Sequence, residues 1–258
     1  RMLYRCHVAL EAKDFAVGLR LEHPQHDIDC IQYHSAEGRG KWLPAAEYSF
    51  VTNVDGRGVY SFCMCPGGVV VPAATGKEQQ VVNGMSSSAR NTPWANSAMV
   101  TSVGQEELRA MNYEGLFAGM EFQEALERRA WQEGGGGLYA PAQVLTDFLA
   151  GKEGKVLPST SYKPGIKASL ISEWFPDILC NRLKIGLSQF GHKAPGFVSD
   201  RALLLGVETR TSSPVRIPRN AQCMHPEIVG LYPCGEGAGY AGGIISAAMD
   251  SKKCAENI

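Results

Sequence analysis

The sequence lacks most features that would tie it to a macromolecular partner. Its 258 residues carry a formal net charge of -1 and no cluster of lysine or arginine, so nucleic acid and anionic membrane are poor candidates as partners. No apolar run reaches the length of a membrane span, and the first residues, RMLYRCHV, do not resemble a signal peptide. Because Arg1 precedes Met2, we expect a fragment of a longer chain.

Metal-site and disulfide patterns are also missing. The eight cysteines include no C-x-x-C pair, and the six histidines are scattered. His23 and His26 flank Pro24, but no second group of ligands has matching spacing, so we predict no metal site. Free thiols in a reducing cytoplasm explain the cysteines most simply, which predicts a cytoplasmic protein.

The first hundred residues are predicted to be rich in strands. Apolar and other residues alternate with period two over residues 15–22, which predicts a half-buried strand. Asp55-Gly56 lies between two apolar runs and predicts a hairpin. The further strand predictions cover residues 48–53, 59–64, 69–74 and 79–83.

The middle of the sequence changes to helical patterning. Apolar residues at helical spacing predict a helix over residues 120–133, stopped by four glycines. A second helix is predicted to begin at Pro141 and end at Gly151, and a third to run from Pro176 to Phe190, closed by Gly191. A strand over residues 202–208 follows, and the pattern as a whole predicts an α+β module carried on an α/β base.

A glycine-rich segment near the end, LYPCGEGAGYAGG, contains a literal G-x-G-x-x-G at residues 237–242. It lies between a predicted strand, residues 228–234, and a predicted helix, residues 244–258, which is the context of a dinucleotide-binding turn. No second strand and no acidic residue about 20 positions further on follow it, so the fingerprint is incomplete. We expect the segment to complete a ligand site whose other half lies elsewhere, with Glu236 accepting hydrogen bonds from sugar hydroxyls. The alternative is a tight turn that needs glycine, with Glu236 solvated.

Three other stretches could bind a ligand. Cys63 and Cys65 would share one face of a strand, as a redox pair, as soft metal ligands or, in the favoured interpretation, as small buried residues. Arg210 and Arg216 flank a run of hydroxyl residues, and could hold a carboxylate or phosphate or lie in a solvated loop. Residues 83–91 place consecutive serines before Arg90, lining a polar pocket or capping a following helix.

Six segments of the sequence together resemble a known family. GLYPCGEGAGYAGGI resembles the C-terminal flavin-binding segment of two-domain FAD oxidoreductases of the glutathione-reductase-like superfamily. FAVGLRLEHPQ, YSFCMCPGG, VVNGMSSSARN and GVETRTSSPVRI, with ANSAM, are similar to the bacterial FAD-dependent, or NAD(FAD)-utilizing, dehydrogenases. The motifs occur in the family's order over nearly the whole chain.

This resemblance implies a domain organisation. An N-terminal Rossmann half of the parent chain would precede Arg1 and carry the primary diphosphate-binding turn. Residues 1–14 would be a remnant of the FAD-binding domain, and residues 15–201 an inserted α+β substrate domain with a mixed or antiparallel sheet plus helices. Residues 202–258 would return to the FAD-binding domain as its C-terminal strand, turn and helix.

The resemblance also implies roles for individual residues. A helix from Ala238 would point at the isoalloxazine ring and stabilise negative charge on it. Cys65 and Arg210 would be catalytic. The substrate-binding residues would be Cys63, Arg90, Thr211, Ser212, Ser213 and Arg216. The cofactor-binding residues would be Cys234, Gly235, Glu236, Gly237, Ala238, Gly239, Tyr240, Gly242, Gly243 and Ile244.

The predicted function is therefore the C-terminal part of a FAD-dependent dehydrogenase with a small-molecule substrate and NAD(P)H as a candidate electron donor. The chain alone is expected to bind FAD weakly or not at all and to be inactive, because the resemblance places most cofactor contacts in the other half. Two alternatives remain open: a ligand-binding or interaction module without flavin, and a thiol-redox protein that uses Cys63 and Cys65.

Overall fold

A computed structural model describes residues 1–154 and 156–258, and the chain forms two compact units. Unit 1 comprises residues 1–16, 102–124 and 210–258, and unit 2 comprises residues 17–101 and 125–209. The predicted boundary at residue 202 falls inside unit 2, and the predicted substrate domain contains residues 102–124 of unit 1. The fold is mixed α+β with a mixed sheet, as predicted.

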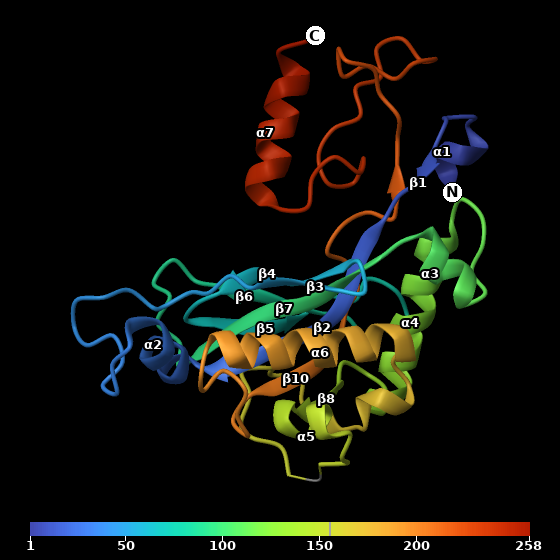
Figure 1. The fold of residues 1–258 in the computed structure, drawn as a ribbon. Helices are drawn as coiled ribbons and strands as arrows, with labels where there is room; N and C mark the ends of the chain where they lie inside the picture. Colours follow the sequence, from blue (N-terminus) through green and yellow to red (C-terminus); the bar gives the residue numbers. More distant parts are fainter. Residues whose placement is uncertain (155) are drawn as a thin grey trace. The chain divides into compact units, whose positions relative to one another are not determined.

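A seven-stranded sheet of order β3-β4-β7-β2-β10-β8-β9 organises unit 2 (Figure 1). The pairs β2–β10, β10–β8, β3–β4 and β4–β7 are antiparallel, whereas β8 and β9 are parallel. The strands are β2 (Phe15–Pro24), β3 (Val51–Val54), β4 (Arg57–Cys65), β7 (Trp94–Val103), β8 (Ala140–Val144), β9 (Ile166–Ala168) and β10 (Leu203–Glu208). The Asp55-Gly56 hairpin is confirmed, with positive φ at both residues.

Strand β2 differs from the half-buried strand that its alternation predicts. Residues 15–23 are all buried, including Arg20, Glu22 and His23. The reason is position, since β2 lies at the centre of the sheet between β7 and β10 and both of its faces are covered. Polar residues at alternate positions therefore mark buried polar contacts in this strand, not a solvated face.

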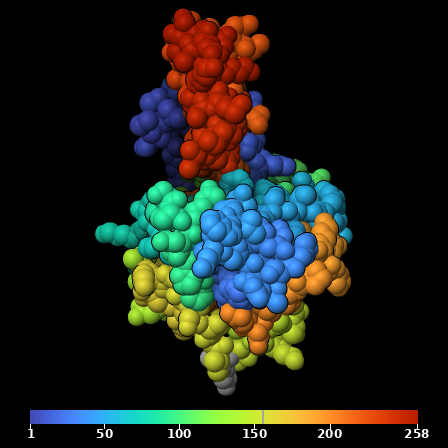
Figure 2. All heavy atoms as spheres, turned by 90° about the vertical axis from the view of Figure 1, so that its left-hand side faces the viewer, coloured from blue at the N-terminus to red at the C-terminus, as the bar shows by residue number. Residues whose placement is uncertain are grey.

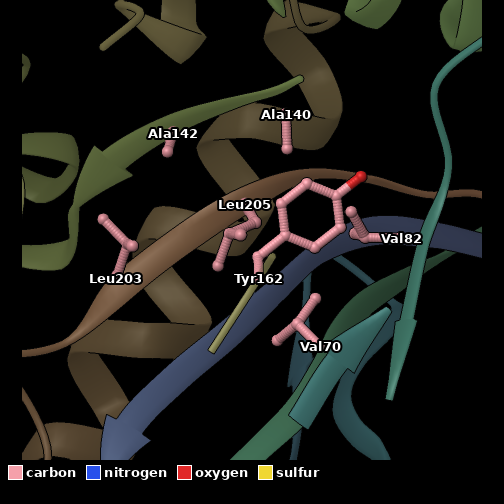
Figure 3. Close-up of a cluster of buried hydrophobic side chains, with 7 residues drawn as sticks. All are labelled: Val70, Val82, Ala140, Ala142, Tyr162, Leu203 and Leu205. Carbon is pink, nitrogen blue, oxygen red and sulfur yellow. The ribbon is translucent and has the colours of Figure 1, made fainter. Parts of the chain in front are cut away.

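A second hairpin, β5 (Gly68–Pro72) with β6 (Val82–Ser86), packs on the sheet. Its valines meet side chains of β8 and β10 around the ring of Tyr162, which is 3% exposed (Figure 3). The Tyr162 hydroxyl donates a hydrogen bond to the Leu138 carbonyl at 2.7 Å, so the ring is buried without an unpaired polar atom. The cluster comprises Val70, Val82, Ala140, Ala142, Tyr162, Leu203 and Leu205.

The helices of the middle region confirm some predicted boundaries and correct others. Helix α4 (Ala118–Gly134) stops at the first of the four glycines, and α5 (Leu145–Ala150) ends at Gly151 in the left-handed region. Pro141, however, lies in β8, because residues 140–144 are buried and pair with β10. Gly191 does not close α6 (Asp177–Lys193): it lies inside the helix, where an added Cβ would come 2.7 Å from Val198 Cγ2. The remaining helices of this unit are α2 (Gln25–Tyr33) and the 3₁₀ helix η1 (Ile171–Glu173).

Unit 1 contains little regular structure. Its elements are α1 (Met2–Arg5), β1 (Glu11–Ala12), α3 (Gln105–Ala110), β11 (Val215–Arg216) and α7 (Ile244–Ala255), with β1 and β11 antiparallel. The predicted helix 244–258 is confirmed, but the strand predicted over residues 228–234 is wrong. Residues 228–230 form a bend and a turn, which Leu231 N closes by donating to Ile228 O, and residues 231–234 are irregular. Pro233 has no N–H to donate to a neighbouring strand.

Candidate functional site

Residues 235–243 form a compact turn, called here the glycine turn. Gly239 N donates to Glu236 O at 2.9 Å, and Tyr240 N to Gly235 O at 3.1 Å. Gly235 and Gly239 have φ of 74° and 88°, which an L side chain rarely adopts. The helix that follows begins at Ile244, not at Ala238 as the resemblance implied, because residues 236–240 are used for the turn.

An ion pair fixes this turn to α7. Asp250 accepts hydrogen bonds from Arg219 Nη2 at 2.6 Å, from Arg219 Nη1 at 3.0 Å and from Gly235 N at 2.9 Å. The hydrogen bond from Arg219 lowers the pKa of Asp250, and the same contact raises the pKa of Arg219. The guanidinium also lies 3.6 Å from the centre of the Tyr240 ring. Arg219 and Asp250 thus hold both ends of residues 235–240, a role that no sequence motif indicated.

A pocket of about 390 Å³ opens beside the glycine turn. Its size falls within the range of small-molecule sites. It brings two predicted substrate residues, Ser212 and Arg216, together with predicted cofactor residues. The lining residues are Lys13, Ser212, Arg216, Gly239, Tyr240, Ala241, Gly242 and Ser246.

The pocket is cationic. Lys13 and Arg216 both line it, and none of the described lining residues is acidic. Burial and the nearby charge of Arg216 lower the pKa of Lys13. Lys13 Nζ is held by the carbonyl oxygens of Asp14 at 3.1 Å and Ser213 at 3.5 Å. Arg216 Nε is buried and has no hydrogen-bond acceptor among the described residues. The charge of Asp14 opposes the lowering of the Lys13 pKa, and an anion bound here would give both cations a further negatively charged partner.

Other predicted residues of unit 1 lie outside this pocket. Glu236, Gly237, Cys234 and Ile244 are exposed to solvent, and the Glu236 carboxylate is not part of the lining. Thr211 is buried, and its Oγ1 has no partner among the described residues. Arg210, Ser213, Ala238 and Gly243 border the same segments but do not line the pocket. No sequence motif indicated Lys13, which lies in the short polar segment before β2.

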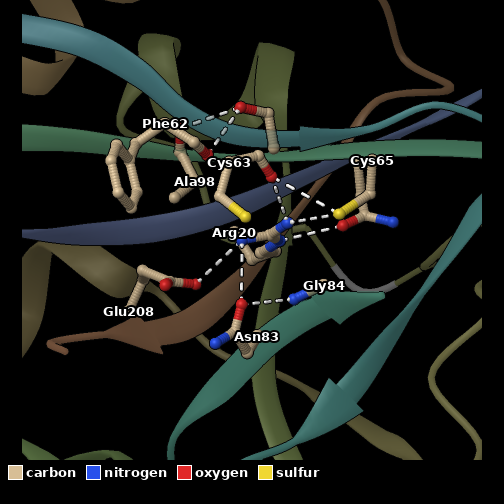
Figure 4. Close-up of polar contacts among 10 residues, drawn as sticks. Arg20, Phe62, Cys63, Cys65, Asn83, Gly84, Ala98 and Glu208 are labelled. Carbon is tan, nitrogen blue, oxygen red and sulfur yellow. Dashed lines mark hydrogen bonds and ion pairs between the residues drawn. The ribbon is translucent and has the colours of Figure 1, made fainter. Parts of the chain in front are cut away.

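Unit 2 contains a second polar centre, built around the buried side chain of Arg20 (Figure 4). Arg20 donates to Asn96 Oδ1 at 2.9 Å, to the Cys63 carbonyl at 2.8 Å and to Glu208 Oε2 at 3.3 Å. Asn83 Oδ1 lies 3.5 Å from Nη1 and Cys65 Sγ 3.4 Å from Nη2. One guanidinium therefore joins β2, β4, β6, β7 and β10. The sequence signal for this polar centre was Arg20 itself, a charged residue within a largely apolar strand.

Two groups around Arg20 have shifted pKa values. Burial raises the pKa of Glu208 to about 7, although the charge of Arg20 and its hydrogen bond oppose the shift. A hydrogen bond with Cys63, followed by burial, raises the pKa of Cys65. Cys65 therefore remains a protonated thiol at neutral pH, which does not favour a catalytic nucleophile there.

Cys63 and Cys65 do not have the same environment, although residues two apart on a regular strand share a face. The register of β4 against β7 shifts between Phe62 and Cys65, and Cys63 has φ of 49°. This β-bulge leaves Cys63 exposed and Cys65 buried, and neither cysteine forms a disulfide. The third candidate in this unit, Arg90, is exposed in a turn with φ of 46°. Strand β7 follows it, so the serines before it do not cap a helix.

In the part of the chain that the structure describes, no group of three or more His, Cys, Asp or Glu side chains could hold a metal ion. Within the same residues, no helix is both long and apolar enough to span a bilayer.

Comparison with known proteins gives two findings. An uncharacterized protein of Clostridium beijerinckii is 46% identical over 263 residues, which cover 100% of this chain and 48% of that relative. The chain thus spans about half the length of the curated relative that it matches. A family model, FAD-dependent protein, C-terminal domain-like, matches residues 14–211. Since this match covers most of the sequence, the chain belongs to the family of FAD-dependent protein, C-terminal domain-like.

Proposed function

We propose that this chain is the C-terminal part of a FAD-dependent oxidoreductase and supplies the glycine turn and its pocket to the flavin site. The family and the resemblance of the motifs to FAD-dependent dehydrogenases support the proposal. The observation that carries it is the pocket, where the predicted cofactor residues Gly239, Tyr240 and Gly242 meet Arg216 and Lys13.

The residues of the pocket fit a flavin dinucleotide. Gly239 lines the pocket without a side chain, and the first turn of α7, which has no side-chain cap, borders the pocket through Ser246. Backbone N–H groups at a helix start and two cations favour a negatively charged ligand. The buried and unpaired Arg216 Nε supplies a donor that the protein itself does not use. FAD, when bound, would supply hydride transfer.

The chain's own residues would position this cofactor. The Arg219–Asp250 pair holds the turn in one geometry before the ligand arrives, which lowers the entropic cost of binding. Lys13 and Arg216 would bind the anionic part. Tyr240, whose hydroxyl donates to Ile217 O at 3.0 Å, would close one wall of the site.

The partner of this surface is proposed to be the N-terminal Rossmann half of the same parent chain. Helix α7 exposes Ile244 at 87%, Ile245 at 73% and Met249 at 69%, and Figure 2 shows the outer side of this helix (red) open to solvent. Apolar side chains grouped in this way are typical of a surface that another element covers.

The oxidoreductase proposal is tested by reducing the flavin of the longer protein. Under anaerobic conditions, addition of NADH or NADPH is expected to bleach the visible flavin band, because hydride transfer reduces the ring. Dithionite serves as the control that the flavin can be reduced. A flavin that dithionite bleaches, but that neither nicotinamide cofactor reduces, would contradict NAD(P)H as the donor.

A further inference from the structure

We propose that Cys30 is a site of reversible modification by small disulfides, with His26 as the base that accepts the proton of its thiol. Both residues belong to α2, within unit 2, so the inference does not depend on the proposed flavin site in unit 1. Figure 2 shows this helix and the loop after it (blue) at the surface that faces the viewer.

Helix α2 places the histidine and the cysteine side by side. His26 and Cys30 are four residues apart, which puts both side chains on one face of the helix. Cys30 Sγ lies 3.5 Å from His26 Nε2, a hydrogen-bonding distance for sulfur. An imidazole in this position can take the thiol proton and so produce the thiolate, the form of cysteine that acts as a nucleophile.

The loop after α2 fixes the histidine ring. Gly38 has φ of 70°, and a Cβ at this position would come 2.9 Å from His26 Nδ1. The absence of a side chain therefore lets the loop backbone approach the ring, and an added methyl group would push the imidazole away. Gly38 N donates a hydrogen bond to Ser35 O at 3.0 Å, which closes the turn that brings the loop to this position.

A pocket of about 420 Å³ gives the thiol room for a ligand. Its volume falls within the range of small-molecule sites. Cys30 is partly exposed and lines the pocket together with the apolar residues Ile31 and Pro195 and the polar residues Asp27 and Ser35. This mixed lining suits a small molecule that carries both a carbon chain and polar groups.

The surroundings of the sulfur favour disulfide exchange over acyl transfer. The Ala36 carbonyl oxygen lies 3.6 Å from Cys30 Sγ. Attack on a carbonyl carbon creates an oxyanion that needs hydrogen-bond donors beside the nucleophile, and a carbonyl oxygen at that place repels it. Attack on a disulfide transfers the negative charge to the leaving sulfur, so no oxyanion has to be stabilised.

The exchange needs no oxidant other than the disulfide itself. His26 Nε2 accepts the proton of the Cys30 thiol, and the thiolate forms a bond to one sulfur of the disulfide while the bond between the two disulfide sulfurs breaks. The leaving thiolate takes the proton back from His26, so that one small thiol is released. The product is a mixed disulfide at Cys30, which an excess of small thiol reverses by the same steps.

The test is the reaction of the 258-residue chain with glutathione disulfide, followed over time by mass spectrometry of its peptides. We expect the mixed disulfide to form at Cys30 roughly tenfold faster or more than at Cys6, an exposed thiol. His26→Gln should remove most of this difference, because it removes the base, and should leave the rate at Cys6 unchanged. His26 is exposed, so this variant should fold.

Gly38→Ala and Gly40→Ala form a matched pair of further variants. Both glycines have positive φ, but a Cβ at Gly40 would meet nothing within 4 Å. Gly38→Ala should slow the reaction at Cys30, whereas Gly40→Ala should react as the wild type does. Far-UV circular dichroism checks folding, and His26→Gln alone decides the result if Gly38→Ala does not fold. Equal rates at Cys30 and Cys6, or a rate at Cys30 that His26→Gln does not change, would overturn the proposal.

Discussion

Replacing Arg20 with methionine is expected to lower the free energy of unfolding of unit 2 by about 3–5 kcal/mol, the typical cost of removing one partner of a buried ion pair. The Arg20 and Glu208 side chains are 0% and 4% exposed. Without the guanidinium, the Cys63 carbonyl and Asn96 Oδ1 also lose a donor. All four tryptophans lie in unit 2, so urea unfolding followed by tryptophan fluorescence reports on this unit.

The loss should be larger at pH 8 than at pH 6. Arg20 lowers the pKa of Glu208, which burial raises to about 7, so in Arg20→Met this pKa lies higher still. The folded variant then retains a proton that the unfolded chain has released, and its stability continues to fall as the pH rises above 7. Arg20→Met/Glu208→Leu should recover much of the loss.

Arg201→Met is the matched control, since Arg201 is 59% exposed and pairs with Asp27 at the surface. Exposed pairs of this kind contribute about 0–1 kcal/mol. An Arg20→Met protein as stable as this control at both pH values would show that the buried pair does not stabilise the sheet.

The second large effect is expected at the glycine turn. Asp250→Ala removes the acceptor of Arg219 and of the Gly235 N–H, contacts that together contribute about 2 kcal/mol or more. Opening of the turn should become roughly 30-fold more frequent. Hydrogen exchange measured by mass spectrometry on the amides of residues 235–240 checks this directly.

Glu256→Ala provides the comparison, because Glu256 pairs with Lys252 on the exposed side of the same helix, where the two side chains are 62% and 78% exposed. In Glu256→Ala, hydrogen exchange at the amides of residues 235–240 should match that of the wild type. If Asp250→Ala also leaves exchange at these residues unchanged, the clamp assigned to Arg219 and Asp250 is wrong.

The sequence predicted local features well where local chemistry determines them. The Asp55-Gly56 hairpin, the start of α6 directly after Pro176 and the end of α5 at Gly151 all depend on the backbone preferences of one or two residues. Features that depend on neighbours in space were missed. The alternation in β2 did not reveal that Arg20 is buried, because the partners of this side chain come from four other strands.

In the candidate site, too, the sequence indicated what local chemistry determines and missed what depends on neighbours in space. Glycine content identified residues 235–243, and the side-chain chemistry of Arg216 suggested an anion. Lys13 lies about 200 residues from Ser212 in sequence, and only the β1–β11 ladder brings them to one pocket. The spacing of Cys63 and Cys65 predicted a shared face, but a β-bulge cannot be read from cysteine spacing.

Whether this chain completes a flavin site can be measured by visible absorption spectra of three proteins: the longer protein, the 258-residue chain, and the longer protein with Gly239→Val. We expect FAD bound by the longer protein, little or none bound by the chain alone, and a clear loss in the variant, whose added side chain would collide with β11. Unchanged tryptophan fluorescence would show that unit 2 of the variant remains folded. A longer protein that is colourless and takes up no added FAD would contradict the claim.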